Sequence, residues 1–282
     1  KQYYRNSQHK LETYSIGLPG SEDLKYARLV AEHLDTDHHE IIVSEEDFFN
    51  AIPEVIEKIE SYDTTTVRAS VGNYLVAKYI KENSDCKVIF NGDGADELMG
   101  GYLYFKKAPN AYEFDKECRR LLQDIHMYDV LRSDRSISNH GLEPRTPFLD
   151  RGFVQTYLSI PMDIRNHTKQ NKCEKHLLRS AFSQLDIIPH EVLWRTKEAF
   201  SDGVSTQQES WFETIQNFAK EKYKDMNMDG PTAEKYWYRE LFNQYYPNCK
   251  EVIPYMWMPK FVEATDASAR TLDIYKSKLY KI

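Results

Sequence analysis

Residues 86–97 read CKVIFNGDGADE, an apolar run that stops at a cluster of glycine and acidic residues. The run at 86–90 is apolar on both faces, which is typical of a central strand in a parallel sheet. Open α/β sheets bind their ligands beyond the carboxyl ends of the strands, where the loop at 91–101 follows. This position predicts a ligand site in the loop. A solvated acidic turn that caps the next helix is the alternative that so short a pattern leaves open.

The loop combines glycines with three acids, Asp93, Asp96 and Glu97. Glycines let the backbone come close to a phosphate, and exposed amides supply hydrogen-bond donors. Carboxylates beside phosphates favour Mg²⁺ between them, because this hard cation prefers oxygen ligands. The pattern therefore indicates a phosphorylated ligand with a cation.

Strand and helix patterns alternate through the first part of the chain. The segments that read as strands are Glu12–Gly17, His39–Val43 and Cys86–Phe90, and those that read as helices are 21–34, 44–62 and Val71–Glu82. Ser21 caps the first helix, Ser44 with Asp47 caps the second, and Pro53 is expected to divide the second. Such alternation predicts the α/β class with a doubly wound parallel sheet.

After Tyr102 the pattern changes to helices alone. The expected helices are Lys116–Ser133, Arg151–Ser159, Glu174–Gln184, Trp211–Lys224, Glu234–Tyr246 and Met258–Tyr280. The acidic and polar stretch Lys222–Thr232 is expected to be a mobile loop. One domain with an α/β part at 1–105 and a mainly helical C-terminal part at 106–282 follows from this change.

The composition limits the functions that the chain can have. A net charge of −7 gives no indication of a basic surface that would bind nucleic acid. No apolar run approaches the roughly 18 residues of a membrane-spanning helix. The four cysteines lie far apart, without the paired spacing of a zinc site, so free thiols in a reducing cytoplasm are expected.

Three further stretches are polar between apolar runs: 62–70, 145–150 and 172–179. The first supplies hydroxyl groups and Arg68, which suit a carboxylate or a phosphate. The third could place Lys175 and Arg179 one helical turn apart. Taken by itself, the third stretch is better explained by a surface helix with solvated charges.

Together these stretches resemble the synthetase domain of the glutamine-hydrolysing asparagine synthetases, over nearly the whole chain. The matching stretches are Ser15–Ser21 (SIGLPGS), 62–70 (YDTTTVRAS), the loop continued to Pro109, Glu143–Asp150 (EPRTPFLD), Glu174–Arg179 (EKHLLR), Lys197–Gly203 (KEAFSDG) and Ala264–Thr271 (ATDASART). The tail from Tyr255 looks more like the eukaryotic type than the bacterial one.

The resemblance implies the fold of the ATP pyrophosphatases and a two-step reaction with ATP and Mg²⁺. The aspartate side chain attacks the α-phosphate of ATP, and ammonia then displaces AMP from β-aspartyl-AMP. By matched position, Ile16 and Gly17 would meet the nucleotide, and Asn91 and Gly92 would contact its AMP part. The other implied site residues are Asp96 for Mg²⁺, Lys175 for pyrophosphate, Thr65, Thr66 and Arg68 for the aspartate and phosphate region, and Asp93 for adenylate formation or attack by ammonia.

Two departures from the family pattern stand out. The family usually has Ser-Gly-Glu-Gly-Ser-Asp-Glu where this chain has Asn91 to Glu97. Asp93 in place of Glu keeps the charge and loses about 1.5 Å of reach. Either the neighbouring backbone has shifted to compensate, or the protein is slower or altered in specificity. Asp93→Glu is therefore expected to raise activity if the loop is otherwise family-like, and to lower it if the backbone already suits Asp.

The second departure is that the family's pyrophosphate loop, Ser-Gly-Gly-x-Asp-Ser, does not occur in these 282 residues. Since a βαβ unit takes roughly 30 residues, this loop and the strand before it are expected upstream of Lys1, which is not a natural start. A glutaminase domain that supplies ammonia is expected further upstream, and the chain alone is expected to be inactive. The expected substrates are aspartate, ATP and ammonia or glutamine, and a homodimer is compatible with the pattern.

Two other readings stay open at this point. A β-lactam synthetase shares the adenylation chemistry, although the stretch at 62–70 and the tail favour asparagine. A non-catalytic homologue that binds only nucleotide or a partner would explain Asp93 and the missing loop, whereas the retained Asp96, Lys175 and Arg68 favour an enzyme.

Overall fold

A computed structural model of the chain describes residues 9–168, 172–205, 210–249 and 251–276. The strands are β1 (Glu12–Gly17), β2 (Asp37–Ile42), β3 (Val88–Phe90) and β4 (Glu143–Arg145). The helices are α1 (Glu22–Leu34), α2 (Glu45–Ile59), α3 (Thr64–Asn83), α4 (Ala95–Met99), α5 (Ala111–Asp124), α6 (Asp129–Ser138), α7 (Arg151–Ser159), α8 (Met162–Arg165), α9 (His176–Phe182), α10 (His190–Leu193), α11 (Phe200–Gly203), α12 (Trp211–Lys222), α13 (Gly230–Tyr245) and α14 (Asp273–Lys276). Short 3-10 turns are η1 (Leu103–Lys107), η2 (Ile125–Met127), η3 (Pro147–Leu149), η4 (Lys224–Met226) and η5 (Ala269–Thr271).

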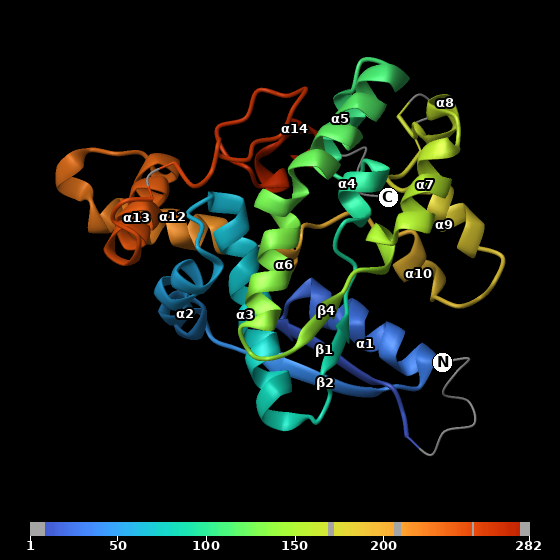
Figure 1. Cartoon of the computed structure of the whole chain (residues 1–282), viewed down its shortest axis with the longest axis horizontal. Helices are drawn as coiled ribbons and strands as arrows, with labels where there is room; N and C mark the ends of the chain where they lie inside the picture. Colours follow the sequence, from blue (N-terminus) through green and yellow to red (C-terminus); the bar gives the residue numbers. More distant parts are fainter. Residues whose placement is uncertain (1–8, 169–171, 206–209, 250, 277–282) are drawn as a thin grey trace.

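The strands form small parallel sheets within an otherwise helical molecule (Figure 1). β1 pairs with β2, and β3 pairs with β4, so the described residues contain two separate two-stranded sheets instead of the expected single one. β3 is not a buried central strand, because Val88 is 43% and Phe90 is 73% exposed. β4 was not expected at all, since its three residues, Glu-Pro-Arg, carry no apolar alternation.

The first helices begin where their capping residues predict. The side chain of Ser21 accepts from Leu24 N–H, and Ser44 and Asp47 form a reciprocal capping box. The prediction that Pro53 divides the second helix is wrong. α2 runs through it, because six buried residues pack this helix against the core and outweigh one lost backbone hydrogen bond.

α3 begins earlier than the predicted helix at 71–82. The Asp63 carboxylate accepts from Thr66 N–H at 2.9 Å and caps the helix, which starts at Thr64. The polar stretch at 62–70 therefore contains the first turn of α3. This places Thr65, Thr66 and Arg68 on one rigid element.

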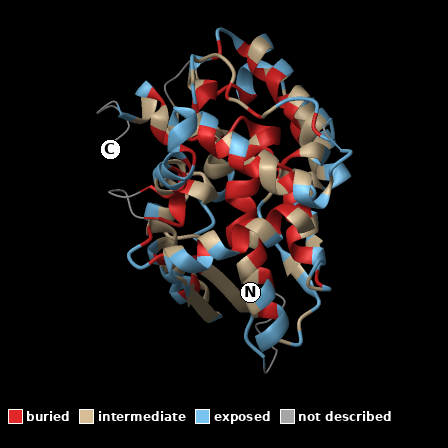
Figure 2. Ribbon diagram, turned by 90° about the vertical axis from the view of Figure 1, so that its left-hand side faces the viewer, coloured by how far each residue is buried: buried red, intermediate tan, exposed pale blue. Residues whose placement is uncertain are grey.

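The main apolar core joins both parts of the chain. Buried residues of α2 and α3 pack against α12 and α13, with Phe48 and Trp211 meeting edge to face at 5.0 Å. Figure 2 shows this buried band running through the packed helices. Burial of large apolar side chains at about 25 cal/mol per Å² is the main stabilising term.

Two helix predictions and one loop prediction in the second half are wrong. The expected helix at 116–133 is two helices, α5 and α6, separated by a 3-10 turn. The expected helix at 258–280 is mostly irregular up to η5 and α14, and its end from residue 277 lies outside the described residues. The expected loop at 222–232 is ordered as a 3-10 turn and the beginning of α13.

The irregular tail is held by side chains instead of by helical hydrogen bonds. Asp63 accepts from Trp257 N–H at 2.7 Å, and Ser268 donates to Asp202 at 3.0 Å. Pro254 and Pro259 have no backbone N–H to give to a helix. The tail is therefore packed onto α3 and onto the segment that contains α11.

Two expectations about the whole chain concern cysteines and membranes. The four cysteines are free thiols, as predicted. Among the described residues, no helix is both long and apolar enough to cross a membrane.

Candidate active site

The glycine and acid loop follows the carboxyl end of β3 and encloses the short helix α4. Gly94 and Gly100 flank this helix in the left-handed conformation, with φ of 86° and 61°. A Cβ at Gly94 would overlap Leu149, and one at Gly100 would overlap Phe114. Glycine is required at both positions because side-chain residues rarely adopt this φ and have no room here. The two glycines thus fix the turn of the loop, and this turn holds the acidic side chains in a defined geometry.

Asp96 of this loop is bound by two lysines. Its Oδ1 accepts from Lys175 Nζ at 2.7 Å, and its Oδ2 lies 3.1 Å from Lys197 Nζ. Burial opposes the charge of Asp96, but the two ammonium groups outweigh it and hold its pKa well below the usual range. Burial likewise opposes the charge on Lys197, and Asp96 outweighs it and raises the pKa of that lysine. The cluster therefore carries a net positive charge, which suits an anionic ligand.

Lys175 reaches Asp96 from an unusual backbone conformation. Its φ of 55° lies in the left-handed region immediately before α9. Such a conformation costs a non-glycine residue energy of about 1–3 kcal/mol and is enriched at functional sites. The cost is consistent with a functional position for this ammonium group.

Gly101→Ala should displace Asp96 from its two lysines. An added Cβ would overlap Asp96 Oδ1, so the carboxylate must move. We expect the Gly101→Ala protein to remain folded, to lose about 1–3 kcal/mol of unfolding free energy, and to lose anion binding at the lysine pair. Urea unfolding and pyrophosphate binding by calorimetry measure the two effects. Gly152→Ala is the matched control, because a Cβ there would come no closer than 3.2 Å to Asp150 Oδ1. Unchanged pyrophosphate binding by Gly101→Ala would contradict the expectation.

Asp93 and Glu97 belong to a second charged network. Arg132 Nη2 donates to Asp93 Oδ1 at 3.0 Å and to Asp129 Oδ1 at 2.9 Å. Tyr102 donates to Glu97 and, at 3.3 Å, to Asp129 Oδ2. Burial, followed by the negative charge of Asp129, raises the pKa of Glu97 well above its usual range. Glu97 therefore favours its neutral form, whereas Arg132 offsets the charges of Asp93 and Asp129.

A large slot lies between β1 and β3. It has a volume of about 1030 Å³ and is lined by residues of both strands, by the loop and by α3. Ile16, Asn91, Gly92 and Asp93 all line it, so the structure brings these four predicted site residues together. Gly17 does not line it, and a Cβ there would lie 2.6 Å from Ser21 Oγ. Gly17 is thus required for the turn into α1.

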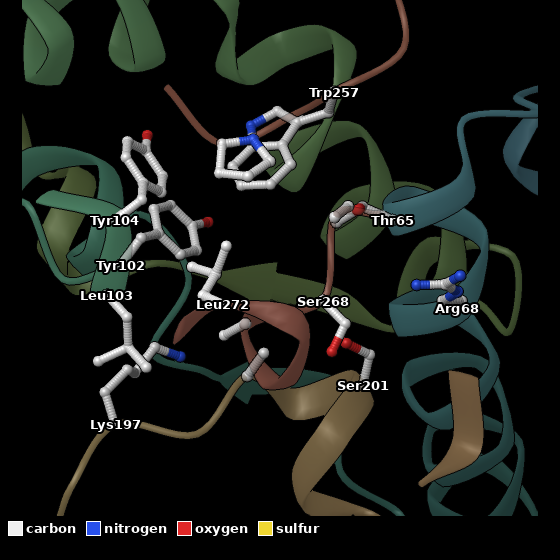
Figure 3. A pocket seen from close by; sticks show the side chains of 14 residues that line it. Thr65, Arg68, Tyr102, Leu103, Tyr104, Lys197, Ser201, Trp257, Ser268 and Leu272 are labelled. Carbon is white, nitrogen blue, oxygen red and sulfur yellow. The ribbon is translucent and has the colours of Figure 1, made fainter. Parts of the chain in front are cut away.

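A second, smaller cavity lies beside the lysine cluster. Its volume is about 50 Å³, and it is lined by Thr65, Arg68, Tyr102, Leu103, Tyr104, Lys197, Ala199, Ser201, Trp257, Pro259, Ala267, Ser268, Ala269 and Leu272. Figure 3 shows three aromatic rings on one side, with Thr65, Ser201 and Ser268 across the space. Lys197 lines this cavity and also contacts Asp96, so the cavity adjoins the charged cluster.

Arg68 and Thr66 are engaged in the interior. Arg68 is 3% exposed and donates to Glu234 from Nε at 2.8 Å and to Asp266 from Nη1 and Nη2 at 2.8 Å. Burial opposes its charge, but Glu234 and Asp266 outweigh this and raise the pKa of Arg68 well above the usual range. Thr66 Oγ1 donates to Asp63 at 2.8 Å. Both side chains position α3 and the tail.

The sequence alone did not single out Lys197, Arg132 and Tyr102. Lys197 stands in a stretch that matches the family, and this match was the available signal. The approach of Lys197 to Asp96 and of Arg132 to Asp93 depends on how distant segments pack. No local pattern carries that information.

The carboxylates of the site fit Mg²⁺ only together with phosphate oxygens. Among the described residues, no group of three or more His, Cys, Asp or Glu side chains could hold a metal ion. Mg²⁺ at phosphate sites is bound by one or two carboxylates and by the phosphates themselves. Asp93 and Asp96 supply carboxylates on the loop, although Asp96 contacts two ammonium groups here.

The chain is an α/β domain in which a glycine and acid loop follows a parallel strand and two lysines pair with one carboxylate of that loop. A family model described as asparagine synthase matches residues 3–114 and 108–268. The chain belongs to the asparagine synthase family.

Two curated relatives show how far the similarity extends. The chain is 45% identical over 284 residues to the glutamine-hydrolysing asparagine synthetase of Gallus gallus, with 97% of this chain and 50% of that protein covered. It is 46% identical over 280 residues to the enzyme of the same name from Homo sapiens, with 96% and 50% covered. The chain spans about half the length of the curated relatives it matches.

Proposed function

We propose that the protein containing this chain converts aspartate to asparagine with ATP, through a β-aspartyl-AMP intermediate. An oxygen of the aspartate side chain bonds to the α-phosphorus of ATP as the bond to pyrophosphate breaks. Ammonia then bonds to the acyl carbon, the bond to AMP breaks, and a proton leaves the new amide nitrogen. The observation that carries the proposal is the pair of lysines converging on Asp96 in a chain of this family.

Each part of the site has a role in this reaction. Lys175 and Lys197 stabilise the charge that develops on pyrophosphate, since fixed ammonium groups in a buried site act strongly on a leaving anion. Ile16, Gly17, Asn91 and Gly92 meet the nucleotide, chiefly through their backbone. Thr65 lies with Lys197 on the smaller cavity, where the aspartate substrate would bind.

Thr66 and Arg68 act indirectly in this proposal, by holding the first turn of α3 in place. Asp93 assists adenylation or attack by ammonia, and Asp96 would be the residue that holds Mg²⁺. The ion would supply charge neutralisation between the phosphate oxygens.

In this proposal, a segment outside these residues would complete the ATP site. β1 and β3 each have one unpaired edge among the described residues, and both strands line the slot. A further strand in the slot would find a partner edge on each side, would cover Val88 and Phe90, and would join the two sheets into the doubly wound one. We propose that this strand carries the pyrophosphate loop, and that a glutaminase domain supplies ammonia.

The test is to assay the full-length protein and the isolated 282-residue chain side by side. We expect the full-length protein to release pyrophosphate only with aspartate and ATP, and to form asparagine with ammonia or glutamine. We expect no turnover by the chain alone, because in this proposal the pyrophosphate loop lies outside these 282 residues. Pyrophosphate release that does not depend on aspartate would overturn the proposed substrate. Turnover by the isolated chain would overturn the location of the ATP site.

A further inference from the structure

Two consecutive residues of α6 hold the first turn of the glycine and acid loop. Arg132 Nη2 donates to Asp93 Oδ1 at 3.0 Å, and Ser133 Oγ accepts from Asn91 Nδ2 at 2.8 Å. Arg132 is 7% and Ser133 is 1% exposed, so both belong to the packed interior. Asp129 fixes Arg132 from the same helix, at 2.9 Å. The loop is therefore tied at two points to a rigid element.

Asn91 uses both ends of its side-chain amide. Its Nδ2 donates to Ser133, while its Oδ1 accepts from Asp93 N–H at 3.2 Å. The Asn91 side chain thus bridges α6 and the backbone of Asp93. Arg132 binds the carboxylate of the same Asp93. Serine at position 91, with a single hydroxyl on a shorter side chain, cannot span both partners. The backbone position of residue 93 consequently depends on Asn91.

The position of the backbone matters because Asp93 has a short side chain. Arg132 holds Oδ1, while Oδ2 accepts no hydrogen bond from the residues that the structure describes. Asp93 also lines the slot between β1 and β3. One oxygen is held by α6, and the other is available to a ligand. A glutamate at this position would carry its carboxylate about 1.5 Å further from the same backbone.

We infer that Asn91 and Arg132 are positioning residues for the Asp93 carboxylate, and that Asn91 and Asp93 form a matched pair. The hydrogen bonds of Asn91 fix the backbone of residue 93. From this backbone position the short Asp93 side chain places its carboxylate where the reaction requires it. The inference rests on the proposed function for its activity readout. It explains why this chain differs from the family pattern at positions 91 and 93 together.

The test is a double-mutant cycle in the full-length protein, with Asn91→Ser, Asp93→Glu and the combined variant. We expect each single change to lower kcat for ammonia-dependent synthesis by about 10- to 100-fold, since displacements near 1 Å can cost that much. The combined variant should return to within a few-fold of the parent, because a longer acid then meets a released backbone. The KM for ATP should change by a smaller factor than kcat. Effects that multiply in the combined variant would overturn the pairing.

Two further variants separate positioning from stability. Ser133→Ala removes the acceptor of Asn91 and should lower kcat as Asn91→Ser does. Ser138→Ala, at an exposed position on the same helix, should leave kcat unchanged. Arg132→Lys keeps the charge with a different reach, and should recover part of the kcat that Arg132→Met loses. Equal losses in the two Arg132 variants, with equal losses in urea unfolding, would make Arg132 merely structural.

A crystal structure of Asn91→Ser decides the inference without reference to any reaction. We expect the Asp93 carboxylate to leave Arg132 in that variant. Persistence of the contact at about its present length would overturn the inference, whatever the protein catalyses. Failure of the parent protein to form asparagine would overturn the proposed function alone.

Discussion

Asp96→Asn in the full-length protein is expected to lower aspartate-dependent pyrophosphate release by about 100- to 1000-fold. This is the size of effect seen when one electrostatic group of a preorganised site is removed. The carboxylate binds Lys175 at 2.7 Å and Lys197 at 3.1 Å, so its loss leaves two ammonium groups without their shared counter-charge. The lysines would separate and no longer converge on pyrophosphate. Steady-state release of pyrophosphate at saturating ATP and aspartate measures the effect.

Titration with Mg²⁺ then separates the two roles of Asp96. If the carboxylate binds the metal in the ATP complex, the Asn variant should need more Mg²⁺ for its residual activity. If it serves only to hold the lysines, the Mg²⁺ requirement should stay as in the parent. Asp85→Asn, the same chemical change at an exposed residue, is the matched control and should be silent. A rate near that of the parent for Asp96→Asn at saturating Mg²⁺ would remove Asp96 from the site.

Arg68→Met is expected to give the largest loss of stability, about 3–5 kcal/mol of unfolding free energy at pH 7. Removing one partner of a buried ion cluster leaves the others charged and unpaired. Glu234 and Asp266 are 0% and 3% exposed, so water cannot replace the guanidinium. Urea unfolding of the purified protein measures the loss. Arg119→Met is the control, because the Arg119 side chain is 55% exposed where it pairs with Asp115, and its loss should cost about 1 kcal/mol or less.

The loss should shrink as the pH falls. Burial opposes the charge of Asp266, but the hydrogen bonds and charge of Arg68 outweigh it and lower the pKa of that carboxyl. A lowered pKa contributes stability above the unfolded-state value, near 4, and that contribution disappears as the pH falls through the folded-state value. The parent therefore loses more stability in acid than the variant does. We expect a triple variant to recover much of the unfolding free energy lost at pH 7. This variant combines Arg68→Met with Glu234→Gln and Asp266→Asn. An equal loss at pH 7 and at about pH 3, below the unfolded-state pKa, would contradict this account.

Local patterns predicted the elements near the start of the chain. β1 and the caps at Ser21 and Ser44 follow from signals that span a few residues: apolar runs, a hydroxyl before a helix and an acid three positions later. Pro53 shows the limit of such signals, because packing of α2 against the core outweighed a local helix-breaking preference. The tail shows the same limit, since side-chain contacts to Asp63 and Asp202 replace the helix that its pattern suggested.

The candidate site likewise has a part that local sequence patterns predicted and a part that they did not. The loop and its position after a strand could be predicted, because glycines and acids directly after an apolar run are adjacent in sequence. The fate of Arg68 could not be predicted, because its partners Glu234 and Asp266 lie far along the chain and take up most of its donors. Its motif suggested a ligand contact, whereas its burial supports a structural role.

The sequence by itself determined the family, the glycine and acid loop and the cap that starts each early helix. These features depend on ordered motifs and short-range hydrogen bonds, which involve residues close together in the sequence. Only the tertiary structure decided that Lys175 and Lys197 meet on Asp96, that Arg132 and Asn91 hold the turn at Asp93, and that β3 pairs with β4. These contacts join segments far apart in the chain. Each contact forms because burial makes an unpaired charge or backbone group costly. The packing of the helices then brings the partner of that group close to it.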